Sequence, residues 1–209
     1  MVISKENINK LDKRYRANFI NSISGFKSAN LIGTISKEGK TNLAIFSSVI
    51  HVGANPPLMG FLMRPVSVDR HTYNNIKETG YFTINYINKE IYKQAHQTSA
   101  RYDKDVSEFD ACKLTPQFTE AVKAPYVKES KIKIGCSFVE EQEIKSNGTI
   151  FMVGEILEII LPDETVLSDG YVDIEKAGTI AISGLDGYHE TKKLARLSYA
   201  KPGIEPKEL

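Results

Sequence analysis

Two long strand-like runs meet at Asn147–Gly148 in the second half of the chain. The flanking runs, residues 131–145 and 149–161, are rich in apolar and β-branched residues. Asn-Gly between two such runs predicts a tight β-hairpin in which both turn residues take a positive φ. A long antiparallel hairpin needs further strands to cover its edges, and closing the sheet into a barrel removes those edges altogether.

The first half of the chain also reads as strands joined by turn residues. Residues 37–40 form a turn signal between two strand-like runs and predict a second hairpin. The prolines in residues 53–57 end the second of these runs, because proline cannot donate to a sheet ladder. We expect about seven strands and a few short helices, hence a mainly β chain folded as an antiparallel barrel. Besides the two runs of the long hairpin, the expected strands are 28–36, 41–52, 58–63 and 81–87. The expected helices are 72–80 and 89–98.

Length and composition favour one domain over residues 1–209, with an N-terminal arm at 1–20 and an extended tail at 201–209. The stretch between residues 99 and 119 is polar and has no clean period. A net charge of +1 gives no electrostatic footprint for nucleic acid or an anionic membrane. We find no apolar run long enough for a membrane span and no secretory signal, so we expect a cytoplasmic protein. The two cysteines lack metal-ligand spacing, and we expect reduced thiols and no metal site.

A candidate anion site lies at the start of the helix predicted from residue 72. Arg70 and His71 precede it, and a helix N-terminus offers unpaired N–H groups and a positive dipole end. Thr72 adds a hydroxyl, and Asn75 lies one turn further on the same face. Thr72 or Asp69 is expected to cap the helix, and Gly80 to end it. The plainer interpretation is a solvated Arg-His pair beside an ordinary N-cap.

The second predicted strand carries small and hydrogen-bonding residues on one face. Strand residues alternate between faces, so Asn42, Ala44, Phe46 and Ser48 share one side of the strand. A flat ligand could lie against this face, with Ala44 leaving room. The plainer interpretation is that Ser47 and Ser48 face solvent at a sheet edge.

Several segments together resemble the flavin reductase family, and within it the flavoredoxin-like branch. They are SANLIGTIS, TNLAIFSSV, NPPLMGFLMRP, RHTYNNIKETG, YFTIN, HQTSARYDKDVSEFD and ISGLDGYHETKKLARLSYAKP. The resemblance implies an FMN-binding split barrel that forms a homodimer, with FMN bound near the subunit interface. It implies NADH or NADPH as a transient hydride donor and a small-molecule substrate or electron acceptor.

The resemblance also assigns residues to the cofactor. It implies that the flavin ring lies beside Asn30, Leu31, Asn42, Ala44, Ile45, Ser47 and Ser48, and that the phosphate is held by Arg64, Arg70, His71, Thr72 and Asn75. Members of the family often show a Thr-Thr pair near the end of the first strand, where this chain has Gly33-Thr34. That departure bears on the position given to Asn30.

Two residues are candidates for the substrate side of the flavin, namely His96 on a predicted helix and Tyr188 near the C-terminus. A partly buried polar group and a core aromatic are the plainer interpretations of the two. No protein nucleophile or catalytic base stands at a recognisable spacing, and flavin chemistry requires none. Two other functions stay open: a flavin-binding electron carrier without turnover, and a dimeric split barrel that binds another ligand such as haem.

Overall fold

The hairpin predicted from the sequence is the longest feature of the fold. The computed structural model describes residues 1–209, and in it β9 (Lys133–Ile144) pairs antiparallel with β10 (Thr149–Ile160), with Ile144 opposite Thr149. The turn spans four residues, 145–148, and of its Asn-Gly pair only Gly148 has a positive φ, of 72°. The hairpin is therefore confirmed, whereas the expected two-residue turn is wrong. The Ile144 carbonyl accepts hydrogen bonds from the amides of both Asn147 and Gly148, which closes the longer loop.

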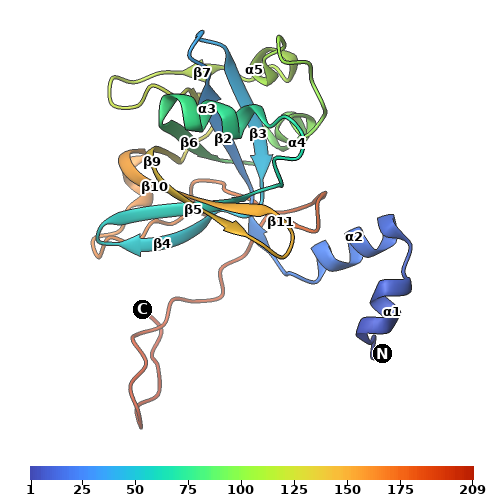
Figure 1. Ribbon diagram of the computed structural model, residues 1–209. Coiled ribbons are helices and arrows are strands. Elements are labelled where there is room, and N and C mark those ends of the chain that lie inside the picture. Colours follow the sequence, from blue (N-terminus) through green and yellow to red (C-terminus); the bar gives the residue numbers. More distant parts are fainter.

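Seven antiparallel strands form the main sheet, in the order β3-β2-β6-β9-β10-β5-β4. The expected strand 41–52 divides at residues 47–49, and its two parts lie at opposite ends of this order. Because so short a link joins the two edge strands, the sheet must curl until its ends approach each other. This is the split barrel, mainly β with a few short helices (Figure 1). The remaining strands are β2 (Asn30–Ile35), β3 (Thr41–Phe46), β4 (Ile50–Ala54), β5 (Pro57–Met63) and β6 (Tyr81–Tyr86).

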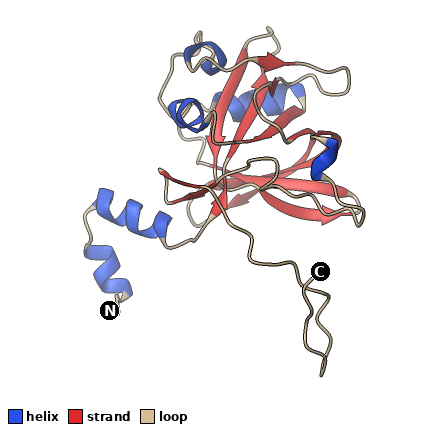
Figure 2. Ribbon diagram, turned by 180° about the vertical axis from the view of Figure 1, so that it is seen from behind, coloured by secondary structure: helices blue, strands red, loops and turns tan.

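Helices and two small sheets accompany the barrel, and the two N-terminal helices stand away from it (Figure 2). The helices are α1 (Lys5–Lys10), α2 (Lys13–Ser22), α3 (His71–Thr79), α4 (Tyr92–Gln97), α5 (Glu108–Ala111) and a 3-10 turn η1 (Asp163–Thr165). One small sheet contains β1 (Lys27–Ser28), β11 (Ala181–Ser183) and β12 (Gly187–His189), and the other contains β7 (Pro116–Gln117) and β8 (Tyr126–Val127). All the helices are too short or too polar to cross a bilayer.

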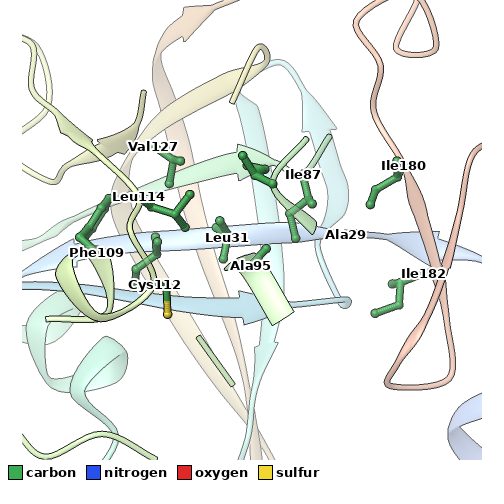
Figure 3. Close-up of a cluster of buried hydrophobic side chains, with 12 residues drawn as sticks. Ala29, Leu31, Ile87, Ala95, Phe109, Cys112, Leu114, Val127, Ile180 and Ile182 are labelled. Atoms are coloured by element: carbon green, nitrogen blue, oxygen red, sulfur yellow. The ribbon is translucent and has the colours of Figure 1, made fainter. Parts of the chain in front are cut away.

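Two hydrophobic clusters lie on opposite faces of the strands next to the candidate site. One fills the curled sheet and includes Phe61, Phe82 and Met152. The other lies outside β2 and β3 beneath α4 and α5, and includes Leu31 and Leu43 (Figure 3). The expectation of an irregular segment at 99–119 is thus wrong in part, because α5 and β7 form there and Phe109 enters the core.

The two ends of the chain project from the barrel (Figures 1 and 2). Neither α1 nor α2 has a buried residue. The C-terminal tail doubles back at Gly203, so that Leu197 lies opposite Glu208 and Lys201 opposite Ile204. The expectation of an extended tail is therefore wrong, because a glycine with a φ of 74° allows the chain to reverse.

Candidate functional site

The start of α3 presents backbone N–H groups without acceptors in the chain. Its N-cap is Arg70, whose side chain makes no capping hydrogen bond, and the first amide to find a helical acceptor is that of Asn74, at 3.0 Å from the Arg70 carbonyl. The expected caps are wrong, because Thr72 lies inside the helix and the Asp69 carboxylate accepts from the Asn74 side chain at 2.6 Å. The nine-residue helix ends at Gly80, which has a φ of 77°, as expected.

A buried network fixes this helix start against the sheet. The Asn42 Nδ2 atom donates to Thr72 Oγ1 at 3.0 Å and to Thr34 Oγ1 at 3.1 Å. The Asn75 Nδ2 atom donates to the same Thr34 oxygen at 3.1 Å. All four side chains are buried. Because the Thr72 oxygen serves as an acceptor here, its hydroxyl proton stays available to a ligand.

The three candidate cations differ in how firmly they are placed. The Arg70 Nε atom donates to the Pro65 carbonyl at 3.3 Å, which leaves the other four guanidinium N–H groups for a ligand. The His71 Nε2 atom lies 3.7 Å from an Asp69 oxygen. Arg64 is exposed and makes no hydrogen bond or ion pair within the chain.

A polar pocket of about 260 Å³ opens beside the helix start, between α3, the β2–β3 turn and the loop before α5. Three of the candidate residues line it, namely Asn42, His71 and Asn75. Its rim carries both Lys40 and Lys104 and the acidic Glu38 and Glu78, and Lys40 is ion-paired with Asp105. Arg70 and Thr72 do not line this pocket, so the structure gathers part of the predicted phosphate set there and leaves Arg70 facing the loop that precedes the helix.

The ring-lining candidates follow the edge strand β3 and the bend after it. Ala44, Ile45, Ser47 and Ser48 are all half-buried. The predicted alternation of side chains along β3 is confirmed for Asn42 and Leu43, because Asn42 faces Thr72 and Leu43 enters the outer core cluster on the other face. Ser48 is already engaged: its hydroxyl accepts from the Leu62 amide at 3.1 Å and donates to the Leu62 carbonyl at 3.3 Å.

The comparisons with known proteins agree on the fold and the family. The flavin reductase like domain matches residues 24–176. The chain belongs to this family. A split-barrel protein of Shewanella frigidimarina NCIMB 400, provisionally named a flavin reductase, is 57% identical, covers 96% of this chain and 100% of its own, and superposes with a TM-score of 0.92.

Two further relatives are more distant. A flavoredoxin of Methanosarcina acetivorans is 25% identical over 86% of this chain and 90% of its own, with a TM-score of 0.68. An uncharacterised protein of Aquifex aeolicus is 30% identical over 69% of this chain and 74% of its own length. The resemblance drawn from the sequence to the flavin reductase family is confirmed.

Two residues that the family resemblance assigned to the flavin are enclosed in this flavin reductase-like domain. Leu31 is fully buried in the outer core cluster. Asn30 is also fully buried, its Nδ2 atom donates to Ser28 Oγ at 2.8 Å, and its Oδ1 atom has no partner. Neither side chain reaches the surface beside β3.

The two substrate-side candidates meet in space although they lie far apart in the chain. The His96 Nδ1 atom is 2.9 Å from the Tyr188 hydroxyl, and the Tyr92 ring lies 5.5 Å from that of Tyr188. Burial raises the pKa of Tyr188 to about 12, so this phenol stays protonated near neutral pH. In neutral His96 the phenol therefore donates to Nδ1, and the ring proton sits on Nε2.

Sequence reasoning missed one buried acid next to β3. The Glu108 Oε2 atom accepts from the Leu43 amide at 3.0 Å, which satisfies a donor on the free edge of the sheet. Burial raises the pKa of Glu108 and the Leu43 hydrogen bond opposes that rise. Glu108 lies in the polar stretch at residues 99–119, which has no clean period, so no sequence pattern indicated a buried acid there.

Proposed function

We propose that this chain binds FMN non-covalently, with the phosphate at the start of α3 and the flavin ring along β3. The observation that carries the proposal is the set of amides at residues 71–73, which have no acceptors in a helix whose cap side chain makes no hydrogen bond. Such a helix start suits an anion. Membership of the flavin reductase-like family makes the FMN phosphate the natural candidate.

The side chains around the helix start fit a phosphate dianion. Arg70 has a forked guanidinium, and only one of its five N–H groups is used within the chain. Charge-assisted hydrogen bonds from the other groups to a phosphate would be strong. Thr72 offers a hydroxyl proton, and the buried network holds it in place. We assign Asn75 and His71 to the pocket side of the phosphate, and Arg64 to an outer position that attracts the anion without a fixed contact.

The ring part of the proposal rests on accessibility. Ala44 and Ile45 remain half-buried on the edge strand β3, and Ser47 is half-buried in the bend after it, so a flat apolar ring can lie against them. Asn42 marks the end of the ring nearer the phosphate, and Ser48 the far end through its fixed hydroxyl. Asn30 and Leu31 support the strand from inside the fold and are left out of the contact set.

We propose further that the protein is an oxidoreductase using NADH or NADPH, and that electrons pass to a small-molecule acceptor or a partner protein. Bound FMN would supply reversible hydride acceptance. The chain would orient the ring, neutralise the phosphate and exclude water. His96 and Tyr188 would face the acceptor, with the Nε2–H group of His96 as a hydrogen-bond donor.

Absorption spectroscopy tests this function. Purified protein should carry a flavin band, and anaerobic NADH or NADPH should bleach it. A flavin that stays oxidised with both donors would leave an FMN-binding electron carrier and contradict the reductase proposal. A purified protein without flavin that also fails to take up added FMN would contradict the binding proposal itself.

A further inference from the structure

A second pocket, of about 220 Å³, lies at the opposite end of β2 from the network at the start of α3. It is bounded by β1, the end of β6 and residues 174–181. Backbone contacts join these segments, because Ser28 lies opposite Ala181 and the Ile180 amide donates to the Ile87 carbonyl at 3.1 Å. None of the residues assigned to the flavin lines this pocket, so it is separate from the proposed FMN site.

The turn before β11 forms one rim of the pocket. The Thr179 amide donates to the Ile174 carbonyl at 3.0 Å, and Gly178 takes a φ of 74°, which allows so tight a turn. Ile174 and Thr179 therefore come together on the rim, while Ile180 continues into the outer core cluster. An apolar wall with a few polar groups is typical of a small-molecule site. The apolar lining residues are Phe26, Tyr86, Ile174, Ile180 and Ala181.

The pocket offers no free charge to a ligand. Lys27 is the one charged residue in its lining. The Lys27 Nζ atom donates to the Asn21 carbonyl at 3.2 Å, to Ser24 Oγ at 3.1 Å and to the Gly184 carbonyl at 3.0 Å. An ammonium group has three N–H donors, so all of them are used within the chain. Because enclosing an unpaired charge is costly, the pocket suits a neutral molecule.

The Tyr86 side chain gives the pocket an unused hydrogen-bond donor. Its ring packs against the core inside the curled sheet, and its hydroxyl makes no hydrogen bond within the chain. Burial raises the pKa of Tyr86, so this phenol stays protonated near neutral pH. Asn30 lies directly opposite Tyr86, is fully buried, and has an Oδ1 atom without a partner. Most buried polar groups in proteins are paired, and here the chain leaves two neighbouring groups without partners.

We propose that this pocket binds a small neutral molecule that consists of one ring and one hydroxyl or carbonyl group. The ring lies against the apolar wall, and the oxygen of the ligand accepts a hydrogen bond from the Tyr86 hydroxyl. The volume limits the ligand to a single ring, since pockets for drug-sized ligands measure roughly 300–1,000 Å³. The pocket also borders the bend after β3, because Ser28 Oγ donates to the Val49 carbonyl at 3.2 Å. The site does not depend on FMN binding.

Titration of the full-length, ¹⁵N-labelled protein with benzyl alcohol tests the proposal by NMR spectroscopy. Saturable shifts are expected at the amides of Ser28, Tyr86 and residues 179–181, which line the pocket. Benzoate and benzylamine carry the same ring with opposite charges. Each should bind at least about tenfold more weakly than benzyl alcohol, because the pocket provides no partner for either charge.

Three variants locate the ligand within the pocket. Tyr86→Phe removes only a hydroxyl that has no partner in the chain, so it should leave the fold intact and raise the dissociation constant about three- to tenfold. Ala181→Leu fills the pocket and should abolish binding. Tyr81→Phe makes the same chemical change at the other end of β6 and should leave the dissociation constant unchanged.

Three results would overturn the proposal. The first is the absence of saturable shifts at the pocket amides, as expected if a side chain of another molecule already fills the pocket. The second is a Tyr86→Phe protein that binds benzyl alcohol as tightly as the Tyr81→Phe protein does. The third is a set of shifts centred on β3 that Ala181→Leu leaves unchanged, which would place the ligand in the proposed FMN site instead.

Discussion

Replacing Arg70 by alanine should weaken FMN binding without unfolding the protein. Within the chain the side chain makes one hydrogen bond, to the Pro65 carbonyl at 3.3 Å, and it lies in no hydrophobic core cluster. The proposed phosphate contact uses the other guanidinium N–H groups, and a hydrogen bond to a charged group contributes about 1.5–3 kcal/mol. At about 1.4 kcal/mol per factor of ten, the dissociation constant should rise by roughly 10- to 150-fold.

Fluorescence titration of the apoprotein with FMN measures this change directly. Arg70→Lys keeps the charge but loses the fork, so its affinity should fall between those of wild type and Arg70→Ala. Lys77→Ala removes a cation from the other end of the same helix and should leave the affinity unchanged. A folded Arg70→Ala protein that binds FMN as tightly as the wild type would refute the phosphate assignment.

Three further changes probe the surroundings of the site. Thr72→Val removes a buried hydroxyl, so it should lower FMN affinity by about tenfold and the free energy of unfolding by about 1 kcal/mol, whereas Thr72→Ser should restore both. Burial raises the pKa of Glu108 above its ordinary 4.5, so ionising it costs stability in the folded state. The melting temperature of the wild type minus that of Glu108→Gln should therefore decrease as pH rises from about 4 to about 7. A difference that stays constant over this pH range would contradict this. Gly33→Ala places a Cβ atom 2.2 Å from the Pro125 carbonyl oxygen and should cost about 3 kcal/mol or prevent folding, whereas Gly53→Ala, whose nearest contact is at 3.2 Å, should cost less than about 1 kcal/mol by urea denaturation.

Local patterns in the sequence predicted the elements that local physics controls. The long hairpin and the end of α3 at Gly80 both follow from residues at the turn or terminus itself. The split of the expected strand 41–52 into β3 and β4 does not, because that split arises from closure of the barrel. The bend at residues 47–49 is forced by the order of strands in the sheet, and that order cannot be deduced from any short segment of the sequence.

The site shows the same division. Asn42, Thr72 and Asn75 were named from the sequence, and the structure brings them together in one network. The network also depends on Thr34, which lies opposite Asn42 where β2 pairs with β3. No local pattern indicates this role, because it arises from strand pairing; in the sequence Thr34 stood out only as a departure from the family pattern. Leu31 was assigned to the flavin by family position, yet strand alternation places its side chain in the outer core cluster.

We propose that FMN is held through its phosphate at the start of α3. FMN and riboflavin carry the same ring, so titrating the apoprotein with each one isolates the phosphate. We expect the wild type to bind FMN at least about tenfold more tightly than riboflavin, and Arg70→Ala to remove most of that preference. Equal affinity of the wild type for the two flavins would contradict it.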